Sequence, residues 1–282
     1  MNDFILTLSC PDRVGIVHNV TGWLLNRHGN IIDAQQFGGA ETNRFFLRVH
    51  FNLPEPTTVD ELEASFASVA HRFDMEAQIY DAQRKERVLI LVSRQGHCLN
   101  DLLFRTHSGH LPIEIAGIVS NHNDFASLAA SYNLPFHHLP VTADTRAQQE
   151  QQILDLVNEH RIDLVVLARY MQILSADLCE ALKGRAINIH HSFLPSFKGA
   201  RPYHQAHARG VKIIGATAHY VTSDLDEGPI IEQDIERVHH AMSPAELTQV
   251  GSDIESLVLA RAVRWHVEHR ILLNGDRTVV FR

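Results

Sequence analysis

Hydrophobic and polar positions along residues 4–81 change between strand-like and helix-like spacing in a regular order. Short hydrophobic runs at 4–10, 31–37, 44–51 and 75–81 predict strands. Hydrophobic residues at helical spacing from 16 to about 29 and from 62 to 73 predict two helices, and Thr58 with Glu61 forms a capping-box pattern before the second. The resulting order, βαββαβ, is that of a small ferredoxin-like α+β domain.

The pattern changes after a charged segment, 83–87, which is the predicted linker. Strands are predicted by hydrophobic runs at 87–93, 114–120, 163–170, 186–191, 212–221 and 229–238, and helices are expected near 97–107, 124–132, 144–160 and 243–267. The runs at 87–93 and 163–170 are continuous rather than alternating, as in a parallel sheet covered on both faces. We therefore expect an α/β protein with a small domain at 1–82 and a doubly wound, mostly parallel, Rossmann-like domain at 88–282.

Composition and charge act mainly by excluding classes of protein. The 282 residues are 45% hydrophobic and 21% charged, which is typical of a folded globular chain. No run approaches the roughly 20 apolar residues that span a bilayer, and Asp3 lies where a secretory signal needs basic charge. The net charge of −8 disfavours nucleic-acid binding, and three widely spaced cysteines fit a reducing compartment. We expect a cytoplasmic protein without membrane or nucleic-acid partners.

Polar residues that can carry chemistry follow strands of the second domain, where such sheets bind their ligands. Asn188 and His190 are two apart on one strand, so their side chains share a face. His219 comes late in the next strand, before a polar loop with Asp224 and Asp226. An amide, an imidazole and a carboxylate can supply an oxyanion donor, a proton-transfer group and an orienting base. Because no GxSxG elbow is present, the pattern predicts attack on a carbonyl carbon by water or a substrate amine.

Each of these residues also has a structural interpretation when it is considered alone. A single Asn or His at a strand end is most often a hydrogen-bonding loop residue, and Asp226 before Glu-Gly-Pro fits a turn. His191 is expected to face away from His190 and to be structural. A zinc site of His190, His204 and His207 is the alternative metal hypothesis, but no carboxylate-rich or HExxH spacing accompanies it. We predict neither a metal nor a cofactor.

Longer motifs distinguish between these interpretations. The stretches NIHHSFLP at 188–195, GARP at 199–202 and HYVTSDLDEGPII at 219–231 resemble the folate-dependent formyltransferases, the family with the fold of glycinamide ribonucleotide transformylase. With the leading small domain, the whole chain resembles the formyltetrahydrofolate deformylases within that family. The resemblance implies hydrolysis of 10-formyltetrahydrofolate, as a small-molecule substrate, to formate and tetrahydrofolate. This activity would supply formate for purine synthesis and balance one-carbon pools.

The resemblance also implies roles for individual residues. The family's catalytic asparagine, histidine and aspartate fall on Asn188, His190 and Asp226. The folate-binding residues fall on Arg169, Met171, Gln172, Ile173, Leu174, His219 and Asp224. The small domain resembles an ACT domain, a module that commonly binds amino acids and mediates assembly. This implies a homo-oligomer and an amino-acid effector bound at Asp12, Arg13 and Gly15.

One segment departs from the pattern of the amine-formylating members. The transformylase holds its substrate's phosphate with a Gly/Ser/Asn-rich loop after the first strand of this domain, a setting that suits anions. Here that segment is LVSRQGHCLNDLL at 91–103, which keeps Gly96 but has bulkier neighbours. We therefore expect water as the acceptor. The alternatives are glycinamide ribonucleotide formylation, initiator-tRNA formylation, which the acidic charge disfavours, and a non-catalytic amino-acid sensor, which retention of all three catalytic-type residues disfavours.

Overall fold

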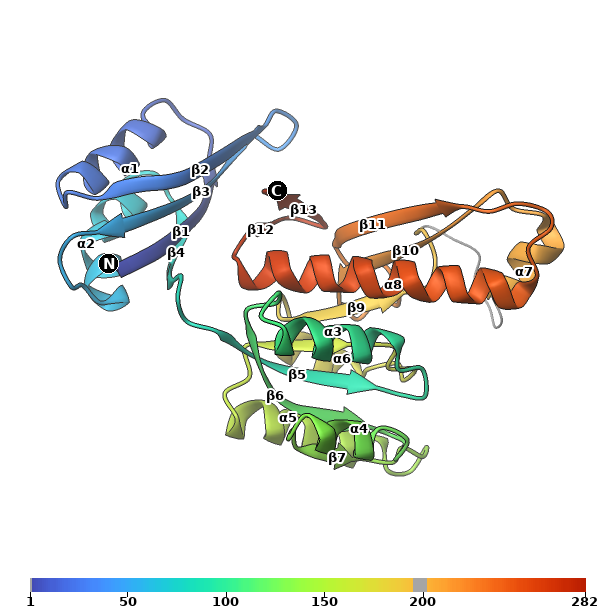
Figure 1. The fold of residues 1–282 in the computed structure, drawn as a ribbon. Coiled ribbons are helices and arrows are strands. Elements are labelled where there is room, and N and C mark those ends of the chain that lie inside the picture. The colour runs from blue at the N-terminus through green and yellow to red at the C-terminus, as the bar shows by residue number, and fades with distance from the viewer. Residues whose placement is uncertain (1, 195–201) are drawn as a thin grey trace. The chain divides into compact units, whose positions relative to one another are not determined.

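The computed structural model describes residues 2–194 and 202–282, and the chain forms two compact units (Figure 1). Unit 1 comprises Met1–Arg84 with Glu268–Arg282, and unit 2 comprises Lys85–Val267. The predicted boundary at the C-terminal end is therefore wrong, since 268–282 were assigned to the second domain. The physical reason is that Leu272 and Phe281 bury their side chains with Phe46, a residue of unit 1.

Unit 1 has the predicted βαββαβ order. Its elements are β1 (Asn2–Pro11), α1 (Ile16–Leu25), β2 (Asn30–Gly39), β3 (Arg44–Leu53), α2 (Val59–Arg72) and β4 (Glu76–Asp81). The strands form one antiparallel sheet in the order β2-β3-β1-β4. The predicted capping box is present, because Thr58 and Glu61 bond reciprocally at the start of α2. The hairpin of β12 (Ile271–Asn274) and β13 (Arg277–Val280) was not predicted.

Unit 2 contains a sheet with strand order β11-β10-β9-β8-β5-β6-β7. The strands are β5 (Glu86–Val92), β6 (Ile113–Ser120), β7 (Phe136–His138), β8 (Leu164–Leu167), β9 (Ala186–His190), β10 (Ile213–Tyr220) and β11 (Ile230–Arg237). The helices are α3 (His97–His107), α4 (Ala126–Ser131), α5 (Arg146–Glu159), α6 (Ala176–Ala181), α7 (Pro202–Arg209) and α8 (Pro244–Val267). In the sheet, β9, β8, β5, β6 and β7 run parallel to one another. The strand β10 runs antiparallel to its two neighbours, β9 and β11. The predicted mostly parallel α/β fold is therefore confirmed. The predicted linker overlaps β5, which begins at Glu86.

The strand order reverses between β5 and β8, and this is the place where a doubly wound sheet opens a crevice. Backbone contacts join the ends of the two strands: Ser93 N–H donates to the Arg169 carbonyl at 3.1 Å. The Ser93 hydroxyl in turn accepts from Met171 N–H at 2.9 Å. The segment after β8 is thereby held beside the segment after β5.

The long helix α8 packs against β9, β10, β11 and α3, as Figure 1 shows in red. Its sheet-facing side is hydrophobic, with Val258 and Leu259 fully buried, but it also buries the carboxylate of Glu255. The strand β5 is fully buried from Val88 to Val92, as its continuous hydrophobic pattern predicts for a central parallel strand.

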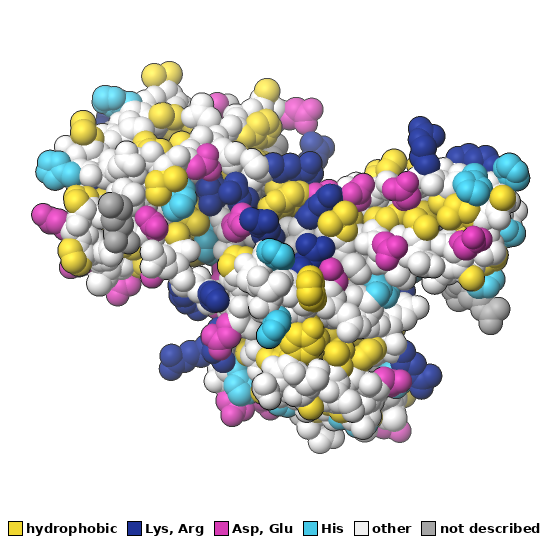
Figure 2. Space-filling view, viewed as in Figure 1, with side chains coloured by type: hydrophobic (Ala, Val, Ile, Leu, Met, Phe, Trp, Pro, Cys, Tyr) yellow, Lys and Arg dark blue, Asp and Glu magenta, His cyan; other side chains and the backbone are white. Residues whose placement is uncertain are grey.

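The short elements β7 and α6 were not predicted, and the three residues of β7 are too few to show a periodicity. Over the part of the chain that the structure describes, no helix is both long and apolar enough to cross a membrane. Side chains of both charges are interspersed over the face of the molecule shown in Figure 2.

Candidate active site

Two neighbouring strands of unit 2 position the central polar residues. Asn188 and His190 are two apart on β9, as predicted, and His219 on β10 lies directly opposite Asn188. The direction of β10 was not predicted. The strands are antiparallel, so His219 reaches Asn188 by cross-strand pairing rather than at a shared carboxyl edge.

His219 determines how the Asn188 amide is oriented. Its Nδ1 lies 2.9 Å from the Tyr220 carbonyl oxygen and therefore carries the proton, so Nε2 is an acceptor. The Asn188 Nδ2 lies 3.2 Å from that Nε2 and donates to it. Burial lowers the pKa of His219, which keeps the ring neutral in this tautomer. The second N–H of the Asn188 amide is then the group available to a substrate oxygen.

Asp226 is brought to His190 by the loop between β10 and β11. This loop approaches β10 so closely that a Cβ on Gly228 would lie 1.8 Å from the Tyr220 carbonyl oxygen, which only glycine allows. Asp226 itself has a φ of 60°, an uncommon conformation for a non-glycine residue and one that recurs at functional sites. The approach of the loop and the turn at Asp226 together place the carboxylate over β9.

The Asp226 carboxylate accepts from His190, with Oδ1 3.2 Å from Nδ1. The hydrogen bond from His190 lowers the pKa of Asp226, and this effect outweighs partial burial, which acts in the opposite direction. Asp226 is therefore ionised at neutral pH, and His190 presents its other nitrogen, Nε2, away from the carboxylate. The His219 Nε2 lies 3.8 Å from Asp226 Oδ1, so His219 links this pair to Asn188 and the residues form one cluster.

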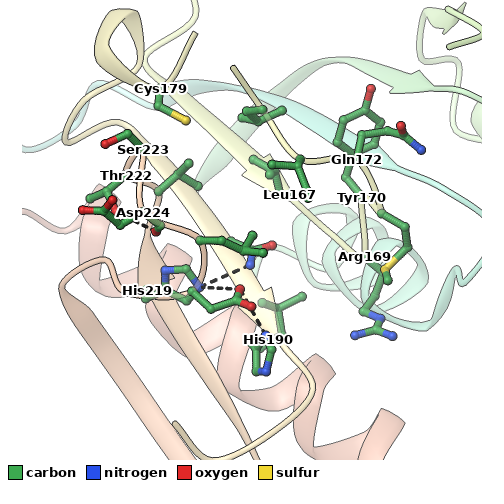
Figure 3. Close-up of a pocket in the computed structure, with 18 of the residues that line it drawn as sticks. Leu167, Arg169, Tyr170, Gln172, Cys179, His190, His219, Thr222, Ser223 and Asp224 are labelled. Atoms are coloured by element: carbon green, nitrogen blue, oxygen red, sulfur yellow. Dashed lines mark hydrogen bonds and ion pairs between the residues drawn. The ribbon is translucent and has the colours of Figure 1, made fainter. Parts of the chain in front are cut away.

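These residues line a cavity of about 230 Å³ between β9, β10 and the segment after β8 (Figure 3). Every residue predicted to be catalytic or to bind folate lines this cavity: Arg169, Met171, Gln172, Ile173, Leu174, Asn188, His190, His219, Asp224 and Asp226. In Figure 3, His190 and His219 lie across the cavity from Arg169 and Gln172. Met171 and Ile173 are more than half exposed, so they offer apolar surface to a flat ligand.

Arg169 differs from its neighbours in this wall because its guanidinium is bound within the protein. Its Nε and Nη2 donate to Gln95 Oε1 at 2.8 and 2.6 Å. The residue is buried, with a φ of 64°. Its role in contacting folate, which the resemblance implied, stays a prediction.

His191 is the residue that the sequence analysis misjudged. It was expected to face away from His190, but it lines the same cavity, and its ring stacks on that of His190 with centroids 4.6 Å apart. The strict alternation of a strand no longer holds at His191, because β9 ends at His190. Burial first, and then the Arg169 guanidinium 3.1 Å from Nδ1, lower the pKa of His191 to about 4.

The residues predicted to bind an effector lie in the turn between β1 and α1. Gly15, with a φ of 98°, precedes the first residue of α1, so glycine is favoured there. Arg13 forms a 2.9 Å ion pair with Asp74, and both side chains are exposed. The motif residues Pro195, Gly199 and Arg201 lie outside the described residues.

Among the described residues, one group of possible metal ligands brings its donor atoms within 4.8 Å of one another: His97, Cys98 and Glu255. These residues do not suit a metal ion. Burial strongly raises the pKa of the Cys98 thiol, whereas a thiolate is the binding form, and Glu255 already accepts from several protein donors. The alternative group of His190, His204 and His207 is not brought together in this way.

The comparisons with known proteins agree with this fold and site. Residues 86–263 match the family model described as formyl transferase. A formyltetrahydrofolate deformylase from Corynebacterium sp. (strain P-1) is 52% identical to the chain, covering 99% of this chain and 98% of the relative. The chain belongs to the formyl transferase family and, within it, to the formyltetrahydrofolate deformylases.

Solved structures distinguish the two branches of the family. A crystal structure of formyltetrahydrofolate deformylase from Burkholderia mallei superposes with a TM-score of 0.96, at 54% identity and with 100% of both chains covered. A glycinamide ribonucleotide transformylase from Symbiobacterium toebii reaches a TM-score of 0.66 at 29% identity, covering 70% of this chain and 95% of that one. The similarity to the transformylase is therefore partial, whereas that to the deformylase spans the whole chain.

Proposed function

We propose that the chain hydrolyses 10-formyltetrahydrofolate to formate and tetrahydrofolate. The observation that carries this proposal is the connected Asn188–His190–Asp226 cluster, which lies at one side of a cavity with an exposed apolar wall. The apolar wall, with Met171 and Ile173, suits the flat pterin. The formyl group then lies over the cluster.

In the reaction, water attacks the formyl carbon and turns a planar amide into a tetrahedral oxyanion. The amide N–H of Asn188 and the Nε2 of protonated His190 donate to that oxygen as its charge develops. Asp226, held ionised beside His190, orders the attacking water. The Asp226–His190 pair takes up the proton of the water and returns one to N10 as the C–N bond breaks. Formic acid and tetrahydrofolate leave the site, formic acid loses its proton to the solvent to give formate, and the residues return to their starting protonation.

The direct test is to incubate the purified chain with 10-formyltetrahydrofolate and no amine acceptor, and to measure formate. Stoichiometric release of formate and tetrahydrofolate supports the proposal. The same assay with added glycinamide ribonucleotide tests the alternative activity, because amine formylation at the expense of formate would make the chain a transferase. Absence of both products would favour a non-catalytic sensor.

We also propose that the chain forms a homo-oligomer in which unit 1 binds an amino acid at Asp12, Arg13 and Gly15. The left-handed backbone at Gly15 and the exposed Arg13 leave a turn with accessible polar groups. An effector must bind active and inactive states with different affinity, because equal affinity changes nothing.

This regulatory proposal needs point substitutions rather than deletion of residues 1–82, which would expose Leu272 and Phe281. The formate assay with each of the common amino acids should identify an effector. Asp12→Ala or Arg13→Ala should then abolish the response while basal formate release continues. An unchanged response in both variants would contradict this site.

A further inference from the structure

A second cavity, of about 520 Å³, adjoins the first and shares Arg169, Met171, Gln172 and His191 with it. Its other walls come from the segment after β5, from α7 and from α8. The segment after β5 was expected to leave no place for a phosphate-bearing acceptor because its residues are bulky. That expectation is wrong in steric terms, since open space remains beside Gln95 and His97. The question is why an acceptor other than water is not bound there.

Glu255 of α8 lies at the wall of this cavity, and its side chain is only 2% exposed. Its Oε2 lies 2.6 Å from His97 Nε2 and 3.4 Å from Arg169 Nε. Its Oε1 accepts from the Tyr203 hydroxyl at 2.8 Å. Burial by itself would raise the pKa of Glu255, but the bond from His97 and the charge of Arg169 lower it, so the carboxylate is ionised.

Each of the three nitrogens of Arg169 makes a contact within the protein. Two of its nitrogens donate to Gln95, the third donates to His191, and its charge faces Glu255. A buried guanidinium is otherwise the side chain best suited to bind a phosphate in bidentate fashion. Arg94, the other arginine of this cavity, is exposed at its rim, where water screens its charge.

The packing around Glu255 shows that the arrangement is built into the fold. A Cβ on Gly251 would lie 2.0 Å from the Tyr203 hydroxyl oxygen, so glycine at this turn of α8 lets the tyrosine reach Glu255. Cys98, next to His97, is completely buried below the same group. The carboxylate, carried by α8, is therefore held from α3, from α7 and from the segment after β8.

We propose that Glu255 determines acceptor specificity: it binds His97 and Tyr203 and compensates the charge of Arg169, so that the second cavity holds a phosphate-bearing acceptor poorly. Water, which is neutral, still reaches the formyl carbon. This inference rests on the proposed hydrolytic function. On this inference, an anionic amine is excluded because the positive charge of the cavity is already compensated, and not because the cavity lacks room for it.

The test measures binding of inorganic phosphate by calorimetry at constant ionic strength, with Glu255→Gln against the wild-type chain. The variant keeps the shape of the side chain but leaves Arg169 uncompensated, so affinity for phosphate should rise about tenfold or more. Glu180→Gln is the matched control, because Glu180 is largely exposed in α6 and the same charge is removed away from the cavity. A folded Glu255→Gln variant without increased phosphate affinity would overturn the proposal.

Gln95→Ala provides a second test that leaves the buried carboxylate in place. It removes one acceptor from Arg169, but Glu255 still compensates the charge, so phosphate affinity should stay within about twofold of wild type. A tenfold gain in Gln95→Ala would overturn the proposal even if Glu255→Gln does not fold. Because phosphate binding is measured without turnover, failure of this inference is distinct from failure of the hydrolytic function, which would appear as absent formate release.

Discussion

The two cavities that meet at Arg169 and His191 contain similar side chains but use them in opposite ways. In the first cavity, Asn188 and His190 are each held by one partner, His219 or Asp226, and each keeps one further polar group, the second amide N–H or the ring Nε2, for a ligand. In the second, His97, Arg169 and Tyr203 converge on the single carboxylate of Glu255. The difference teaches that a cavity's reactivity depends on which donors remain available after the protein has satisfied its own groups.

The largest effect is expected from Asp226→Asn, because this substitution removes the charge that holds His190 while keeping the shape. Turnover should fall by about 10³–10⁴, as for other removals of an acid–base partner. Steady-state formate release measures the effect. Asp224→Asn, in the same loop and cavity wall, should instead act mainly on KM. Equal losses in kcat for the two variants would contradict the distinction between them.

Asn188→Ala should lower turnover by about 10²–10³, the usual result of losing one oxyanion donor. The physical reason is that the amide N–H matters most when charge develops on the formyl oxygen. Measurement of kcat and of folate affinity separates the two effects. A variant with normal kcat and weakened folate binding would show that Asn188 only positions the substrate.

The pH dependence of the free energy of unfolding tests the environment of His191, which lines both cavities. His191, with its pKa lowered to about 4 by burial and Arg169, binds fewer protons when folded than when unfolded, where its pKa is about 6.5. Its contribution to the free energy of unfolding is therefore full above pH 6.5 and is lost as the pH falls towards 4. His191→Gln should reduce this pH-dependent change by about 1–3 kcal/mol in denaturant titrations.

The exposed His240 provides the matched control for that measurement, as the variant His240→Gln. His191 differs from His240 because it is more buried and because its Nδ1 lies 3.1 Å from Arg169 Nη1. Identical pH profiles for the two variants would show that His191 does not carry the dependence.

The smallest effect is expected from exhaustive chelation, which should leave formate release unchanged. Among the residues that the structure describes, the one group with closely spaced ligand atoms, His97, Cys98 and Glu255, is occupied by internal hydrogen bonds and a protonated thiol. Activity that is lost on chelation and restored by Zn²⁺ would change the interpretation of the second cavity.

The first cavity was largely predictable from the sequence, whereas the second was not. Asn188 and His190 lie two apart on a short hydrophobic strand, and this local spacing places both side chains on one face. Glu255 lies instead within a long helix, where one acidic residue among hydrophobic ones resembles an ordinary solvent-facing position. Its burial depends on α3, α7 and α8 coming together, which no local pattern expresses.

The C-terminal domain boundary and the antiparallel direction of β10 were missed by the sequence prediction for the same physical reason: both depend on contacts between residues far apart in the chain. The segment 268–282 follows α8 directly in the chain, so its position in the sequence suggested unit 2, but its hydrophobic side chains pack with Phe46 of unit 1. The antiparallel pairing that places His219 opposite Asn188 was not predicted, because the direction of a strand depends on the path of the chain rather than on the strand's own residues.

By itself, the sequence determined the alternation of strands and helices, the capping of α2 and the pair of side chains on β9. These depend on interactions between residues close together in the chain, which repeat with the period of the helix or the strand. Only the tertiary structure decided which polar groups remain available for a ligand. That outcome depends on long-range contacts such as Glu255 with Arg169, because burial makes each donor bind an acceptor wherever the fold provides one.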